Sequence, residues 1–390
     1  MSGSYLSRGV DPEKADVHQA LRGISKGLYT DTFCKLLPDL LAGDPAYATI
    51  LHADTAGTKA ALAYLYWRET GDTTVWRGIV QDALVMNFDD MACSGALGPF
   101  AVSATLGRNR RLVPGEVVVE LIGAAEAFFE HMRTWGIEVQ SAGGETADVG
   151  DLVRTLDVGY TVATRLKRSA VQHIQLTPGM VCVGIASFGQ ARYEPSYTSG
   201  IGSNGLTFAR HELLHQYYRA QYPETYDPGL EEQVVYQGPY RVTDPSPVPN
   251  QTVGQLLLSP TRTYLPFLKA LFGLGLPLGG IVHCTGGGQT KVVHFIPQRS
   301  VTVLKDNLPP PPPVFDLLGS TGASPRELYQ VFNMGVRLEV YLQPEAAPGV
   351  IGCANQLGLE AWVTGRVAAY DGNARLHLTD PVRGEVYSYS

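Results

Sequence analysis

The chain has 390 residues, a net charge of −7 and a hydrophobic fraction of 44%, as expected for an ordinary globular protein of two or three domains. No lysine- or arginine-rich block extends beyond 108–111, which argues against a nucleic-acid partner. No apolar run reaches the roughly 18 residues that span a bilayer, and the N-terminus lacks a signal-peptide layout, so we expect a soluble cytoplasmic protein. Five scattered cysteines without a CxxC pair are typical of a reducing compartment.

The first half of the chain alternates strand-like and helix-like segments. Asp72 is a good N-cap for the first helix, and Gly136 stops the second, strongly amphipathic one. The predicted elements, in chain order, are strand 47–54, helix 72–87, strand 100–106, helix 116–135, strand 137–142 and strand 154–166.

The second half repeats this alternation after a polar stretch that ends in Pro178-Gly179, near which we place a domain boundary. Its predicted elements are strand 180–187, helices near 205–221 and 260–272, strand 279–287, helix 289–297, strand 301–306, a helix after 324, strand 337–342, a helix near 346–357 and strand 361–367. The pattern predicts a mixed α+β (α/β) fold with an N-terminal domain, 1–170, and a C-terminal α+β domain, 171–390. The proline run 309–313 is expected to be a stiff, extended connector.

The segment HADTAGTK, 52–59, combines groups that suit a metal and a phosphate at a strand end. Asp54 can hold a divalent cation, and Gly57 lets the backbone approach an anion. Thr58 supplies a hydroxyl and Lys59 a positive charge. The segment is not a Walker A loop, and alone it would be an ordinary strand–turn–helix junction.

Two further acidic clusters strengthen this interpretation. Asp89 and Asp90 follow a mostly apolar helix, where the helix dipole disfavours acids unless a cation is present. The segment 141–151 sets carboxylates beside a glycine pair: Gly143, Gly144, Glu145, Thr146, Asp148 and Asp151. Together the three clusters predict a metal–nucleoside triphosphate site.

Two glycine-rich loops are expected to open helices and bind an anion. The first contains Ser203, Asn204 and Gly205, which could equally act as a plain N-cap. The second, HCTGGG at 283–288, contains His283, Thr285, Gly286 and Gly287. A triple glycine is costly to order, so a plain turn is a poor explanation for it.

The segment 211–215 matches H-E-x-x-H, the zinc-protease signature. The alternative interpretation, which the apolar spacing favours, is a helix that buries Leu213 and Tyr217 and exposes its histidines to solvent. No third histidine follows at the protease spacing.

In order along the chain, these segments resemble those of aminoimidazole ribonucleotide synthetase, also called phosphoribosylformylglycinamidine cyclo-ligase. YLSRGVD, HADTAGTK, NFDDMACSGA and GGETA resemble the family's Y-x-x-x-G-V-D, D-G-V-G-T-K, V-N-D-L-x-x-x-G-A and GGETA. GSNGLTFAR, LLSPTRTYL, HCTGGG and VFNMGVRLEV resemble its H-S-N-G-Y-S-L-V-R, L-L-x-P-T-R-I-Y, H-x-T-G-G-G and F-N-M-G-x-G-M. Several collinear matches are more specific than any one of them.

The resemblance implies an ATP- and Mg²⁺-dependent enzyme that closes the imidazole ring of formylglycinamidine ribonucleotide in purine biosynthesis. It implies a homodimer whose N-terminal halves share a β-barrel near the ATP sites. It places magnesium on Asp54, on Asp89 or Asp90, and on Glu145. It places the nucleotide on these residues and on Gly57, Thr58, Lys59, Gly143, Gly144 and Thr146. It places the substrate on Ser203, Asn204, Gly205, Thr285, Gly286 and Gly287, with Lys59 and His283 as catalytic candidates.

The chain departs from the family pattern mainly on the expected substrate side, at Thr55, Gly202 and Lys291, and in an insertion around 193–197. Two alternatives therefore stay open. One is another ATP-dependent small-molecule phosphotransferase of the same superfamily, similar to selenophosphate synthetase or thiamine monophosphate kinase. The other is a non-catalytic nucleotide-binding protein, against which Asp54, Lys59 and Glu145 argue.

Overall fold

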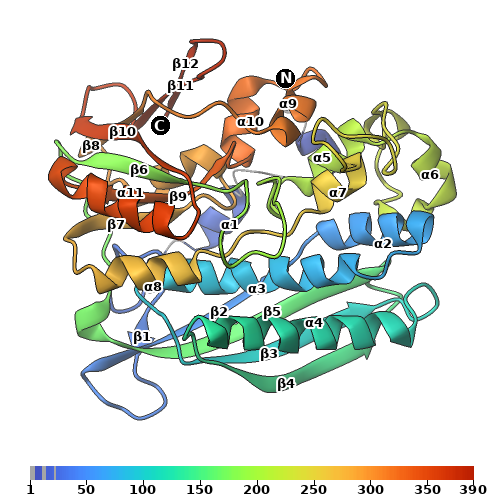
Figure 1. The fold of residues 1–390 in the computed structure, drawn as a ribbon, viewed down its shortest axis with the longest axis horizontal. Coiled ribbons are helices and arrows are strands. Elements are labelled where there is room, and N and C mark those ends of the chain that lie inside the picture. The colour runs from blue at the N-terminus through green and yellow to red at the C-terminus, as the bar shows by residue number, and fades with distance from the viewer. Residues whose placement is uncertain (1–4, 11–14, 22) are drawn as a thin grey trace.

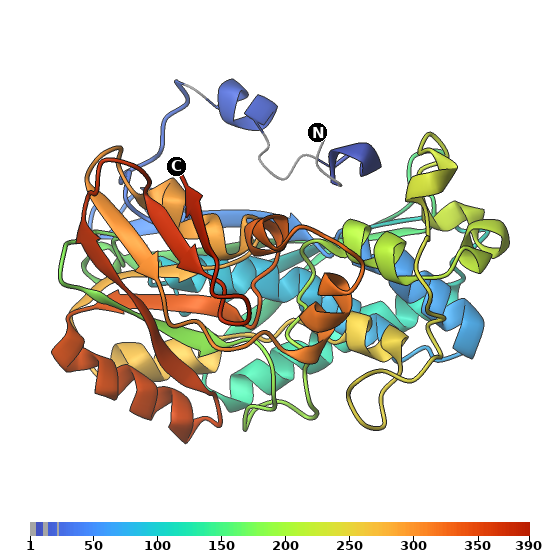
Figure 2. The same ribbon diagram turned by 90° about the horizontal axis from the view of Figure 1, so that it is seen from above.

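A computed structural model describes residues 5–10, 15–21 and 23–390 and shows two β-sheets with helices between and beside them (Figure 1). Asp11 of the YLSRGVD segment lies outside the described residues. The short helices η1 (Leu6–Arg8) and α1 (Ala15–Ala20) run along one side of the molecule (Figure 2). No helix among the described residues is both long and apolar enough to cross a membrane.

The N-terminal sheet has the strand order β1-β2-β5-β3-β4. All its neighbours pair antiparallel except β3 and β4, which are parallel. Its strands are β1 (Leu37–Pro38), β2 (Tyr47–Thr55), β3 (Phe100–Arg108), β4 (Val139–Asp148) and β5 (Leu156–Lys167). Buried and exposed residues alternate along β5, so one face of the sheet packs on a core and the other does not.

Three helices cover the packed face of this sheet: α2 (Lys59–Thr70), α3 (Val75–Cys93) and α4 (Gly115–Thr134) (Figure 1). The opposite face has no helix from the described chain. Leu51 on that face is 60% exposed, and Ala53, Thr105 and Glu145 are exposed as well. Apolar side chains of this face, such as those of Leu51 and Ala53, are therefore exposed to solvent.

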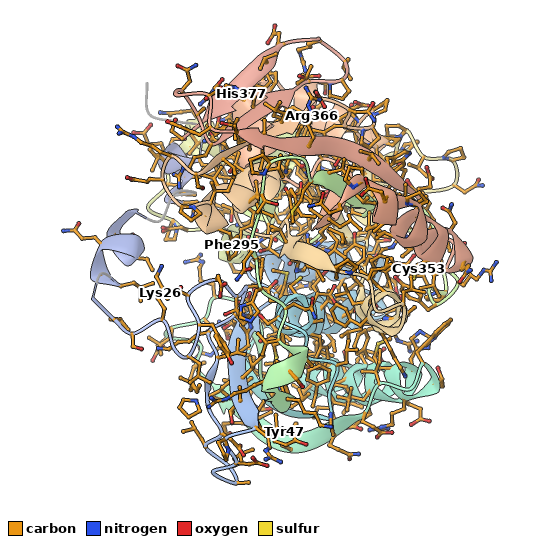
Figure 3. All side chains as sticks on the ribbon, turned by 90° about the vertical axis from the view of Figure 1, so that its left-hand side faces the viewer. Lys26, Tyr47, Phe295, Cys353, Arg366 and His377 are labelled. Atoms are coloured by element: carbon orange, nitrogen blue, oxygen red, sulfur yellow. The ribbon has the colours of Figure 1, made fainter. Side chains whose placement is uncertain are left out.

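The C-terminal sheet has the order β12-β11-β8-β10-β6-β9-β7. Its strands are β6 (Val181–Ala186), β7 (Leu278–His283), β8 (Val301–Lys305), β9 (Val336–Leu342), β10 (Ala361–Ala369), β11 (Leu376–Thr379) and β12 (Val386–Tyr389). Figure 3 places Tyr47 of β2 at the bottom of the molecule and His377 of β11 at the top, so the two sheets occupy opposite halves. Helix α3 lies between them and contacts both β2 and β7, which explains why it is buried on nearly every side.

Of the remaining helices, some pack against the C-terminal sheet and others against α2. The α-helices are α5 (Leu206–Leu213), α6 (Tyr217–Gln221), α7 (Val253–Leu258), α8 (Leu265–Gly273), α9 (Pro313–Gly319), α10 (Pro325–Val331) and α11 (Ala347–Gln356). The 3-10 helices are η2 (Arg168–Ala170), η3 (Pro223–Thr225), η4 (Glu232–Val234), η5 (Gly288–Phe295) and η6 (Pro344–Ala346). Together the two sheets and their helices confirm the mixed α+β fold.

Several predicted helix boundaries differ from those in the structure. The predicted helix 72–87 starts at Val75 and continues to Cys93, so Asp89 and Asp90 lie inside it and not beyond its end. The predicted helix 205–221 is two helices, because α5 ends at Leu213. The predicted helix 260–272 starts only at Leu265 and is α8, and the predicted helix 289–297 is a 3-10 helix. The proline run is extended only up to Pro312, since the last proline starts α9.

Candidate active site

The structure joins the first acidic cluster to the loop that precedes α5. The hydroxyls of Thr58 and Thr207 are 2.8 Å apart, and Lys59 Nζ donates to the backbone carbonyl of Gly202 at 3.0 Å. These pairs are 149 and 143 residues apart in sequence. The segments HADTAGTK and GSNG therefore meet at one place, as the sequence predicts for parts of one site.

Lys59 is fully buried, and protein oxygens surround its ammonium group. Besides the carbonyl of Gly202, Nζ donates to the carbonyl of Ser259 at 2.7 Å and forms an ion pair with Asp82 at 2.9 Å. Burial lowers the pKa of Lys59, and the neighbouring Asp82 carboxylate opposes that shift. The ammonium thus holds α2, α3 and two C-terminal loops together. A role as a phosphate ligand stays a prediction, because this geometry commits the charge to the protein.

A chain of buried polar groups runs from α3 to β9. Asp90 accepts a hydrogen bond from His283 Nδ1 at 2.7 Å, and Arg337 Nε donates to His283 Nε2 at 3.0 Å. Burial lowers the pKa of His283 to about 4, and hydrogen bonding to His283 holds the pKa of Asp90 below its usual value although burial opposes this. The imidazole is therefore neutral, and both of its nitrogens are engaged.

His52 belongs to the same site, and the sequence interpretation missed it. Its Nδ1 donates to Asn87 Oδ1 at 2.9 Å, and its Nε2 is 3.7 Å from Asp90 Oδ2. Its side chain is 24% exposed, whereas that of His283 is fully buried. The available signal was spacing, because His52 and Asp54 are two residues apart on one strand and must share a face.

Asp89 and Asp90 point to different places. Asp89 is fully buried and accepts hydrogen bonds from Thr263 Oγ1 at 2.8 Å and the Tyr264 amide at 2.9 Å, at the start of α8. Burial raises the pKa of Asp89 to about 7, and the two donors oppose that shift. Asp89 on α3 thus stabilises the start of α8 through these hydrogen bonds. Asp90 is the carboxylate that faces His52 and His283. The predicted nucleotide role of Asp89 has no support in this geometry.

The two glycine-rich loops face each other. A side chain added at Gly286 would lie 3.9 Å from Asn204 Nδ2, which places the Thr285–Gly287 loop opposite the Ser203–Gly205 loop. Gly205 and Gly288 both have positive φ, and a Cβ on either would overlap the segment around Phe332. The glycines are therefore required by close packing as well as by backbone conformation.

The loop between α10 and β9 holds both glycine-rich loops in place. Asn333 Nδ2 donates to the carbonyl of Gly200 at 2.8 Å, and Gln289 Nε2 donates to the carbonyls of Asn333 and Val336. Lys305 in turn donates to the carbonyl of Gln289 at 2.6 Å. The segment VFNMG, 331–335, thus stabilises both glycine-rich loops through these hydrogen bonds.

Within a single chain, the GGET segment does not reach this site. Thr55, Gly159, Thr105 and Glu145 pair in one row across the sheet, so Glu145 lies three strands, or about 14 Å, from the end of β2. Asp54 is adjacent to Thr55 and points to the opposite face. Among the residues that the structure describes, no three His, Cys, Asp or Glu side chains form a metal-binding group. The predicted magnesium set of Asp54, Asp90 and Glu145 is therefore not assembled within a single chain.

The zinc-protease match is also resolved. His211 is fully buried, not solvated as predicted, and its ring packs against Tyr236 with centroids 4.7 Å apart. Burial lowers the pKa of His211 to about 2. His215 lies beyond the end of α5, so the two histidines do not share a helical face. The prediction of an exposed helix face is wrong because the 234–240 loop covers this side.

The insertion before the GSNG loop is packed firmly. Glu194 forms a two-point ion pair with Arg262, at 2.7 and 2.6 Å, and Tyr193 OH donates to the carbonyl of Thr263 at 2.8 Å. Lys291, another departure, has its ammonium 5.6 Å from the ring centroid of Phe33. Phe33 also stacks on Phe295 with ring centroids 5.2 Å apart, so this part of the chain packs on η5.

Comparison with known families decides the classification. A profile described as the N-terminal domain of AIR synthase related protein matches residues 38–166, and its C-terminal counterpart matches residues 177–376, just over half of the chain. The chain belongs to the AIR synthase related family. The positions of the two matches correspond to the two sheets.

Two relatives carry the same enzyme name. The chain is 29% identical over 324 residues to the phosphoribosylformylglycinamidine cyclo-ligase of Methanocaldococcus jannaschii, covering 82% of this chain and 78% of that protein. It is 28% identical over 387 residues to that of Thermococcus kodakarensis, covering 95% and 96%.

Solved structures support the AIR synthase fold. A chain of a HypE-HypF complex superimposes with a TM-score of 0.56 at 12% identity, covering 96% of this chain and 99% of that chain. The Thermotoga maritima PurL complexed with FGAR superimposes with a TM-score of 0.52 at 15% identity, covering 88% and 45%. At these identities the similarity concerns the fold alone.

Proposed function

We propose that this chain catalyses the ATP-dependent cyclisation of formylglycinamidine ribonucleotide to aminoimidazole ribonucleotide in purine biosynthesis. The observation that carries the proposal is the meeting of HADTAGTK, GSNG and HCTGGG around Asp90, in a chain whose relatives bear the cyclo-ligase name. The sister phosphotransferase activities have no comparable support and become outcomes of the test.

The proposed chemistry turns a poor leaving group into phosphate. The formyl amide oxygen attacks the γ-phosphorus of ATP, and ADP leaves. The amidine nitrogen then bonds to the formyl carbon, the carbon–oxygen bond breaks, and the oxygen departs within phosphate while the nitrogen loses a proton. Catalysis of this kind rests on positioning and on neutralising phosphate charge.

Among the residues present, Asp90 is well suited to bind magnesium. The side chain of Asp90 is 12% exposed; its Oδ1 binds His283 at 2.7 Å, and its Oδ2 lies 3.7 Å from His52 Nε2. Asp54 lies on the same face of β2 as His52. Mg²⁺ would neutralise charge on the ATP phosphates there. Gly57 and Thr58 would frame these phosphates, and Ser203 to Gly205 with Thr285 to Gly287 would hold the substrate.

We propose that His52, and not His283 as the sequence suggested, transfers the proton. A proton-transfer group needs a nitrogen that can reach substrate or water. His283 has neither nitrogen free, whereas His52 is partly exposed and its Nε2 faces Asp90. In this assignment His283 positions Asp90 and does not touch the reacting atoms.

We further propose that the ATP site is completed by a second copy of the chain. Glu145 and Asp54 cannot meet within one chain, but edge strand β4 and the open face of the N-terminal sheet are available to a homodimer partner. Gly143, Gly144, Glu145 and Thr146 would then serve the site of the partner copy. Closing an exposed edge by pairing also removes an aggregation risk.

A mixed-dimer assay tests the activity and this arrangement together. Asp54→Asn and Glu145→Gln are each expected to abolish ADP release that depends on formylglycinamidine ribonucleotide. A heterodimer of the two variants should regain about half of the wild-type activity, because one of its two sites contains neither substitution. If both residues act within one chain, the heterodimer has no intact site and stays inactive.

The remaining outcomes separate the alternatives. A wild-type protein that binds ATP without substrate-dependent turnover would favour a sister phosphotransferase. A protein that does not bind ATP at all would refute the proposed function. A monomer at assay concentration with full activity would refute the shared site alone.

A further inference from the structure

Arg337 on β9 is the most unusual charged residue of the candidate site. Its side chain is 1% exposed and among the largest that the fold buries completely. Its hydrogen-bond acceptors are His283 Nε2 at 3.0 Å, Met86 Sδ at 3.1 Å and Asn204 Oδ1 at 3.4 Å. All three acceptors are neutral.

The guanidinium therefore lacks a direct counter-ion. Asp90 contacts the opposite nitrogen of the His283 ring, and among the described residues no carboxylate forms an ion pair with Arg337. Burying a cation without an anionic partner is costly, so a ligand that supplies the missing negative charge would stabilise it. Within the described part of the chain, Nη1 also meets no acceptor.

The uncommitted end of this guanidinium lies beside the GSNG loop. A Cβ added at Gly202 would overlap Nη1 of Arg337, and Gly202 has φ +73°. Lys59 Nζ donates to the carbonyl of Gly202, and a Cβ added at Gly286 would lie 3.9 Å from Asn204 Nδ2. The buried charge thus lies next to Gly202, where the two glycine-rich loops approach each other.

Positions 202 and 337 depart from the family motifs in a reciprocal way. The motif H-S-N-G has histidine where this chain has Gly202, and F-N-M-G-x-G-M has glycine where this chain has Arg337. A residue-202 side chain would overlap Nη1, so the observed position of the Arg337 guanidinium requires glycine at position 202.

We propose that Arg337 is an anion-binding, specificity-determining residue whose guanidinium binds a phosphate oxygen of a ligand seated between the loops 202–205 and 285–287. The chemical class of the ligand is a phosphate ester, either the 5′-phosphate of the ribonucleotide or the phosphoryl group that ATP transfers. That choice of ligands rests on the proposed function, whereas the anion site itself does not.

The first test measures binding and needs no activity. We expect inorganic phosphate and ribose 5-phosphate, titrated calorimetrically, to bind Arg337→Gln about 10- to 100-fold more weakly than wild type, as for loss of a charge-assisted hydrogen bond. Arg210→Gln is the matched control, because Arg210 is also buried beside this loop but donates to Thr225 and Tyr236. Unchanged binding in Arg337→Gln, or no binding by wild type, would overturn the proposal.

Competition and kinetics then identify the source of the phosphate. If ATP displaces the probe and the kcat of Arg337→Gln falls at constant KM for the ribonucleotide, the group is the transferred phosphoryl. If ATP does not displace it and the KM for the ribonucleotide rises, the group is the 5′-phosphate. If the wild-type protein has no cyclo-ligase activity but its phosphate binding still depends on Arg337, the proposed function is refuted. The inference about Arg337 then still holds.

A reciprocal swap keeps the test valid if Arg337→Gln fails to fold. The double variant Gly202→His/Arg337→Gly should fold better than Gly202→His alone, because the overlap with the guanidinium is removed. Since histidine titrates near neutral pH and arginine does not, its sulfate binding should weaken from about pH 6 to 8 while wild-type binding stays constant. Equal pH dependence in both proteins would contradict the assignment.

Discussion

The role of Lys59 gives the sharpest contrast between the sequence-based expectation and the structure. The sequence predicts a phosphate ligand, whereas the structure shows a fully buried ammonium between Asp82 and the carbonyls of Gly202 and Ser259. We expect Lys59→Met to lower the free energy of unfolding by about 3–5 kcal/mol, because it leaves the Asp82 carboxylate buried without its counter-ion. Asp82 would keep only the donors of Thr261.

A double-mutant cycle distinguishes this structural role from a catalytic one. Because the double variant Lys59→Met/Asp82→Leu removes both charges, it should be less destabilised than the sum of the two single variants. Urea unfolding followed by tryptophan fluorescence measures all four proteins. If Lys59→Met is as stable as wild type within about 1 kcal/mol and has lost ATP binding, the reasoning is wrong and the ammonium serves the nucleotide.

Three further predictions concern stability and accessibility. His211 has its pKa lowered to about 2 by burial, so the folded state binds fewer protons than the unfolded state below pH 6.5, and its contribution to stability is lost as pH falls. By pH 5 this loss should reach about 2 kcal/mol, and His211→Phe should remove that part of the pH slope in urea unfolding. Gly202→Ala should destabilise the protein by about 2 kcal/mol or more, because the added Cβ overlaps Arg337. Gly57 has open space around it, so Gly57→Ala should cost about 1 kcal/mol from the positive φ alone. Similar losses of stability in the two variants would contradict the packing around Gly202. All five cysteines are buried, so a thiol reagent should label the native protein slowly and the urea-unfolded protein at five sites, and rapid native labelling would contradict the fold.

The sequence predicted those elements whose pattern is local. Strand β2, helix α4 and its stop at Gly136 follow from hydrophobic periodicity and a glycine signal, and the structure confirms them. Helix α2 was missed because seven of its residues are buried around most of its surface, so no amphipathic stripe marks it.

The errors in the site come from long-range contacts. Asp89 and Asp90 suggested a bound cation because acids are unfavourable at a helix end. The helix in fact continues to Cys93, and their partners Tyr264 and His283 are 175 and 193 residues away. Arg337 lay in a segment predicted only as a strand, and nothing nearby in sequence shows that its side chain reaches Asn204. Register across four strands, and not local spacing, separates Glu145 from Asp54.

The most direct test of the proposed function follows the oxygen that must leave. Formylglycinamidine ribonucleotide labelled with ¹⁸O in its formyl group is incubated with the protein, ATP and Mg²⁺, and the released phosphate is analysed by mass spectrometry. We predict one ¹⁸O atom in each phosphate, with one imidazole product and one ADP formed for each. Unlabelled phosphate, or ADP release without the imidazole product, would contradict the proposed cyclisation.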